Sequence, residues 1–128
     1  MSKENVISQV LENRRLASLG DAYVNFVYSL ALTKIDGRPT GVKVSDRILA
    51  QAFKLAGLRE CLGTRVTRKD LANACESLLV DAYIRDLLTI EESVGILTRH
   101  PDGIASGLVD LLKLAAERVE QNALANHK

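Results

Sequence analysis

The stretch LASLGDAYVNFVYSLALTK, residues 16–34, constrains the fold most, because it is apolar on both sides of a helix. Asp21 is the only charged residue between Arg15 and Lys34. A helix that is apolar on both sides packs between two partners. Helical spacing gives a first side of Leu16, Leu19, Tyr23, Phe26, Val27 and Leu30, and a second side of Ala17, Val24, Tyr28 and Leu32 around Asp21. We expect the first side to face the core and the second to face something else, such as another subunit.

The rest of the chain also has helical spacing, and no segment alternates like a strand. Its 128 residues are enough for one domain with a single core. Ser45, Thr67 and Thr89 are expected to cap the helices that follow them. Helices are predicted at about 4–12, 14–34, 46–56, 67–88, from 89 to the turn at 100–103, and 102–122. The expected architecture is all-α, with about six helices in one domain spanning residues 1–128.

The composition indicates in which cellular compartment the protein resides. No apolar run reaches the roughly 18 residues that a membrane span needs, and the N-terminal residues lack the apolar stretch of a signal peptide. The two cysteines, Cys61 and Cys75, form neither a CxxC motif nor a cluster with histidine. We therefore expect a cytoplasmic protein with reduced thiols and no membrane partner.

Charge is unevenly distributed along the chain. Residues 34–70 hold nine Lys or Arg against four Asp or Glu, whereas residues 76–128 hold five against nine. A basic middle segment is compatible with a polyanionic partner. A solvated surface of mixed charge explains the same counts.

Two acids stand alone in apolar helices. Asp21 is one, and Glu76 is the only charge in LANACESLLV, residues 71–80, where it shares a face with Asn73. Isolated carboxylates on packed helices are a recurring way to hold a hard divalent cation. Without a cation, two converging carboxylates repel each other. The alternative is that each acid pairs with an arginine or caps a neighbouring helix.

Both acidic stretches resemble one known family. LASLGDAYVNFVYSLAL is similar to the signature helix of the ribonuclease III endonuclease domain, commonly LEFLGDAVL, and LANACESLLVDAYI resembles its second acidic motif. The resemblance covers about residues 11–90 and is closest to compact archaeal and Mini-III-like members, which consist of the catalytic domain alone. It implies a metal-dependent endoribonuclease that hydrolyses double-stranded or structured RNA, without a separate double-stranded-RNA-binding domain.

The resemblance also implies roles for single residues. Asp21 and Glu76 match family carboxylates and would be the catalytic ligands of Mg²⁺ or Mn²⁺, while Asn73 would orient a water or ligate weakly. Ala17 and Asn73 stand where the family usually has two further acids, although Mini-III-like proteins share this reduced pattern. Gly20 would let either a helix or the RNA backbone approach closely, or would serve helix packing alone.

Family members dimerise through the signature helix, so the resemblance implies a homodimer with Ala17, Val24, Tyr28 and Leu32 in the interface. The candidate phosphate contacts are Lys43, Arg47, Arg59, Arg65, Arg68 and Lys69, each of which also fits an ordinary surface residue. Two rival interpretations remain open. One is a ribonuclease III-like pseudoenzyme that binds RNA or a ribonucleoprotein as a structural module, and the other is a helical dimer unrelated to RNA.

Overall fold

A computed structural model describes residues 3–126, and within them the chain forms six α-helices, one short 3₁₀ turn and no strand. The all-α prediction is therefore confirmed. None of the described helices is both long and apolar enough to cross a bilayer. The elements are α1 (Lys3–Leu11), α2 (Arg14–Asp36), α3 (Asp46–Leu55), the 3₁₀ turn η1 (Arg59–Cys61), α4 (Arg68–Ile84), α5 (Ile90–Arg99) and α6 (Ile104–Ala125).

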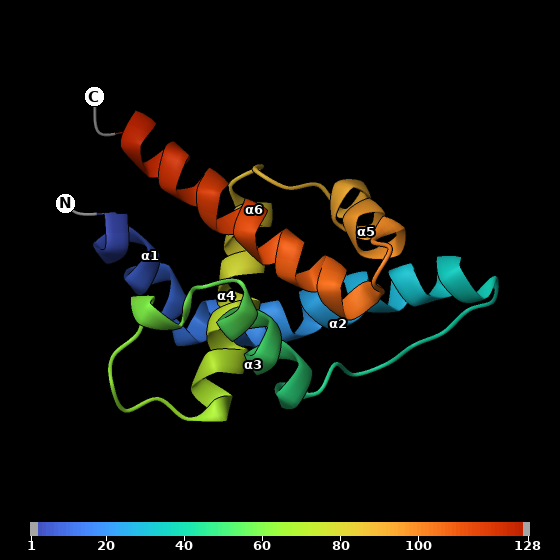
Figure 1. Ribbon diagram of the computed structural model, residues 1–128. Helices are drawn as coiled ribbons and strands as arrows, with labels where there is room; N and C mark the ends of the chain where they lie inside the picture. The colour runs from blue at the N-terminus through green and yellow to red at the C-terminus, as the bar shows by residue number, and fades with distance from the viewer. Residues whose placement is uncertain (1–2, 127–128) are drawn as a thin grey trace.

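Helix α4 is the central element of the fold. From Leu71 to Ala82 every side chain except that of Asn73 is buried. Helices α1, α2, α3 and α6 all pack against it, with α2 crossing it and α6 running diagonally across the molecule (Figure 1). A helix buried on all sides is usually apolar all round, which makes the two buried acids of this stretch, Glu76 and Asp81, conspicuous. Asp81 Oδ2 pairs with Arg85 Nε at 2.9 Å.

The expected side-chain caps fix where the helices begin. Ser45 Oγ accepts a hydrogen bond from the Ile48 N–H at 3.2 Å. Thr67 and Asp70 form a reciprocal capping box at the start of α4. The end of α4 was predicted wrongly, at residue 88 instead of Ile84, because Asp86 takes a left-handed conformation with φ 60° and stops the helix.

Both apolar sides of α2 contribute to the core, so the predicted division into a core side and an interface side is wrong in part. Val27, predicted for the core, is buried there. Ala17, Val24 and Tyr28, predicted for the dimer interface, lie in the core with at most 8% of their surface exposed. Leu19 and Phe26, predicted for the core, are 52% and 53% exposed. The small residues Ala17, Gly20 and Ala31 lie on the buried side, where they let α2 approach its neighbours closely. Leu32, the fourth predicted interface residue, is partly buried.

Candidate functional site

Asp21 and Glu76 are brought together where α2 crosses α4. The crossing is close because Gly20 has no side chain: a Cβ there would overlap the Glu76 carbonyl oxygen and lie 2.5 Å from its carbonyl carbon. Contact with the backbone of α4 therefore accounts for Gly20 by helix packing. It also fixes the two acid-bearing turns against each other.

Glu76 is an unusual carboxyl group. Only 3% of its surface is exposed, and this burial, followed by the hydrogen bond and negative charge of Asp21, raises its pKa to about 8. The charge of Asp46 acts in the same direction, and that of Lys69 opposes it. At neutral pH the Glu76 carboxyl group consequently keeps its proton and donates it to the Asp21 carboxylate.

Asp21 is the solvent-facing member of the pair, with its side chain 48% exposed. Lys43 Nζ lies 4.0 Å from Asp21 Oδ2. Asn25, one turn further along α2, donates from Nδ2 to Asp21 Oδ1 at 3.3 Å and accepts from the Val44 N–H at 2.8 Å. Asn25 therefore orients the carboxylate and holds the loop before α3 at the same time.

Sequence reasoning missed Asp46 and Asn25. Asp46 is the first residue of α3 and lies 3.6 Å from Lys69 Nζ. An acid in the first turn of a helix is favoured by the helix dipole, which explains Asp46 locally. The sequence therefore carried no signal that Asp46 lies near Glu76. The i,i+4 spacing of Asn25 from Asp21 was the available signal for that pair.

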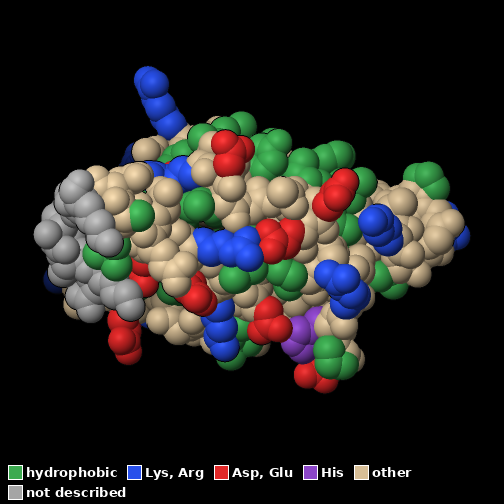
Figure 2. All heavy atoms as spheres, turned by 90° about the horizontal axis from the view of Figure 1, so that it is seen from above, with side chains coloured by type: hydrophobic (Ala, Val, Ile, Leu, Met, Phe, Trp, Pro, Cys, Tyr) green, Lys and Arg blue, Asp and Glu red, His purple; other side chains and the backbone are tan. Residues whose placement is uncertain are grey.

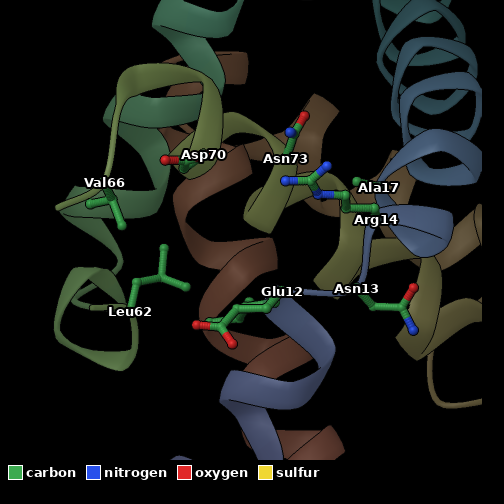
Figure 3. A pocket seen from close by; sticks show the side chains of 9 residues that line it. Glu12, Asn13, Arg14, Ala17, Leu62, Val66, Asp70 and Asn73 are labelled. Carbon is green, nitrogen blue, oxygen red and sulfur yellow. The ribbon is translucent and has the colours of Figure 1, made fainter. Parts of the chain in front are cut away.

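Ala17 and Asn73 meet in a pocket of about 240 Å³, one helical turn before each acid (Figure 3). The α1–α2 junction, the connector before α4 and the first turns of α4 contribute the other walls. These residues are Leu11, Glu12, Asn13, Arg14, Leu62, Val66 and Asp70. The small side chain of Ala17 and the neutral amide of Asn73 thus face a solvent-filled space beside the acid pair.

The residues predicted to contact phosphate lie in different parts of the structure. Lys43 and Lys69 flank the acids. Arg47 and Arg68 line an open groove together with Lys54, which the sequence interpretation did not include. Arg59 instead donates to the carbonyl oxygens of Gly63 and Thr64 and supports the connector. Arg65 is exposed.

The face shown in Figure 2 carries acidic and basic side chains interspersed, without a continuous surface of one sign. This face therefore has no continuous row of basic side chains along which a polyanion would bind. The groove between α3 and the start of α4, lined by three cationic residues and no acidic one, suits a phosphate backbone better.

The carboxyl groups of Asp21 and Glu76 are suited to bind a hard divalent ion with modest affinity. Within residues 3–126, no three His, Cys, Asp or Glu side chains are grouped closely enough to hold a metal. Magnesium, however, commonly takes one or two protein carboxylates and keeps several waters. One buried and one half-exposed carboxylate in hydrogen-bond contact meet that requirement and leave the solvent side open.

A family model described as Ribonuclease III matches residues 14–125. The chain belongs to the ribonuclease III family. The match contains both acids and every helix from α2 to α6, so it extends beyond the stretch 11–90 that carried the motif resemblance. The protein thus has a ribonuclease III-like endoribonuclease domain, of a family that acts on RNA and generally uses divalent metal ions. A comparison with curated proteins found no significant match.

Proposed function

We propose that this ribonuclease III-family protein is a metal-dependent endoribonuclease that hydrolyses phosphodiester bonds of double-stranded or structured RNA. The observation that carries the proposal is the meeting of Asp21 and Glu76 at the α2–α4 crossing, where Gly20 lets the backbones of the two helices approach closely. Perturbed carboxyl pairs at the surface of a rigid scaffold are characteristic of catalytic sites.

In this proposal Asp21 and Glu76 hold Mg²⁺ or Mn²⁺. The ion, when bound, activates a water and stabilises the leaving 3′ oxygen. The protein's own residues do the positioning: Glu76 releases its proton to become a ligand, and Asn25 keeps the Asp21 carboxylate turned in one direction. Asn73, on the wall of the adjoining pocket, orients a water through its side-chain amide.

The RNA partner is supported by the cations around the acids. Lys43 and Lys69 lie beside carboxylates of the site, and the groove of Arg47, Lys54 and Arg68 adds three more positive charges. A-form RNA is recognised largely through its shape and backbone. We assign these five residues to phosphate contacts.

Loss of either acid provides the decisive test. Asp21→Asn and Glu76→Gln are each expected to lower cleavage of a duplex RNA in Mg²⁺ or Mn²⁺ by about a thousandfold or more, because each removes a negative ligand of the cation. The exposed Glu91→Gln is the matched control and should cleave like the wild type. Both site variants should remain folded in thermal melts, since the amide of each variant can keep the hydrogen bond that joins the pair. A large fall in melting temperature for both would show that the acids are structural.

A second candidate is a pseudoenzyme that binds RNA without cutting it. It is favoured by Ala17 and Asn73, which put no carboxylate at the two positions one helical turn before the pair. A wild-type protein that binds duplex RNA but cleaves none in any divalent ion would establish this alternative. A protein that does neither would point to a helical dimer unrelated to RNA.

We propose further that the protein is a homodimer through the exposed side of α2. Leu19 and Phe26 are exposed there, and Tyr23 stacks on Tyr83 of α4 with ring centroids 5.0 Å apart. Because Tyr83 and Ile84 are also exposed, these residues extend one apolar surface across both helices, and a second copy would cover it.

Phe26→Glu is expected to give a monomer at tens of micromolar by light scattering, because it would bury a carboxylate in that apolar surface. Leu124→Glu, at a comparably exposed position near the end of α6, is the control and should leave the dimer intact. A wild-type monomer at this concentration would contradict the dimer.

A further inference from the structure

Arg14 is the first residue of α2 and lines the pocket, where its side chain extends from α2 toward Asn73 (Figure 3). Arg14, Ala17 and Asp21 follow one another at three- and four-residue spacing, so they share one face of the helix. Seven residues separate Arg14 from Asp21, which is about 10 Å along the helix axis. Arg14 therefore lies on the same side of α2 as Asp21, about two helical turns before it.

The surroundings of Arg14 leave its guanidinium available. Within residues 3–126 its side chain makes neither a hydrogen bond nor a salt bridge. Its charge reaches Asp70, whose pKa is lowered first by hydrogen bonds with Thr67 and to a smaller extent by the charge of Arg14. Asp70 Oδ2 is already occupied, because it accepts the Thr67 N–H at 2.9 Å in the capping box.

The pocket would otherwise repel RNA. Glu12 and Asp70 line it, and Asp21 and Glu76 lie just beyond. Arg14 is the only cationic residue on its walls. Guanidinium groups bind phosphate oxygens through paired hydrogen bonds, with a geometry that lysine cannot reproduce.

We propose that Arg14 binds the RNA phosphate adjacent to the one positioned at Asp21 and Glu76. This inference rests on the proposed function, because it places the RNA strand by the acid pair. The pocket lies one turn before the acid on both α2 and α4, so a strand whose phosphate sits at the pair passes over the pocket. Ala17 leaves the space in which Arg14 and the phosphate meet.

The test measures RNA affinity, independently of cleavage, by fluorescence anisotropy of a labelled RNA duplex in Ca²⁺ over a series of salt concentrations. Arg14→Ala should weaken binding about tenfold and reduce the slope of log affinity against log salt by about one, because one phosphate contact is lost. Arg14→Lys should keep the slope while losing part of the affinity. Arg38→Ala, an exposed arginine beyond the far end of α2, is the matched control and should behave like the wild type.

Asp70→Asn distinguishes an RNA contact from a structural partner. Asparagine can still accept the capping hydrogen bond from Thr67 while removing the charge that faces Arg14, so duplex binding should tighten two- to threefold. Equal losses of melting temperature in Arg14→Ala and Asp70→Asn, with unchanged RNA affinity, would overturn the inference. Wild-type affinity and salt slope in Arg14→Ala would also overturn it while leaving the proposed function intact. A wild type that binds no duplex would overturn both.

Discussion

Gly20→Ala is expected to destabilise the protein by roughly 3 kcal/mol, although alanine is the better helix former by about 1 kcal/mol. The added methyl group would overlap the carbonyl oxygen of Glu76. That oxygen belongs to the backbone of the central helix, so no side-chain rotation can make room, and α2 and α4 must move apart. Urea denaturation followed by circular dichroism measures the loss. Because the acids face each other across this crossing, cleavage should fall with stability.

Gly95→Ala is the control for this substitution. A Cβ at Gly95 meets only the end of the flexible Arg99 side chain, which can turn aside. The same methyl group in the middle of α5 should therefore leave stability within about 1 kcal/mol of the wild type or raise it. A Gly20→Ala variant as stable as Gly95→Ala would show that the two central helices are not in backbone contact.

Glu76→Gln is expected to be more stable than the wild type at pH 8.5 by roughly 2–4 kcal/mol, and to lose this advantage near pH 4. The folded protein holds the Glu76 proton up to a pKa of about 8, whereas an ordinary glutamate side chain has a pKa of 4.5. Between these values the folded state binds more protons than the unfolded state, so wild-type stability falls as the pH rises. Glutamine never ionises and avoids the loss.

Denaturant titrations of both proteins at pH 4, 6 and 8.5 measure the difference directly. Most other ionisations are common to the two proteins and cancel in the comparison. A constant difference between Glu76→Gln and wild type across the range would mean that Glu76 ionises normally in the folded chain.

The fold and the acid pair could be predicted from sequence because each left a local signal. Helical spacing gave the elements, and side-chain caps at Ser45 and Thr67 gave their starts. Asp21 and Glu76 were each the only charge in an apolar helical stretch. Such residues need a specific partner, and here each is the other's partner. The family motifs pointed to the same two residues.

Other features depend on contacts between helices, which helical spacing does not reveal. Both sides of α2 are apolar, so hydrophobicity alone could not say which side meets α4. The small residues Ala17, Gly20 and Ala31 decide it, because close backbone approach needs them on the packed side. Likewise, Asp46 is thirty residues from Glu76 along the chain, and only the fold brings its charge close enough to raise the pKa of Glu76. Leu87 and Leu88 continue the apolar pattern beyond Ile84, so the pattern does not reveal that the helix ends before the turn at Asp86.

Asn25 links the Asp21 carboxylate on α2 to the loop before α3. One end of its amide holds the carboxylate of Asp21, and the other holds the Val44 N–H beside Lys43. If an RNA strand draws Lys43 outward, the same movement pulls on Val44 and turns the amide. The carboxylate then loses its orienting donor or follows it. In the proposed function, contact of the RNA backbone with Lys43 would therefore change the orientation of the Asp21 carboxylate through Asn25.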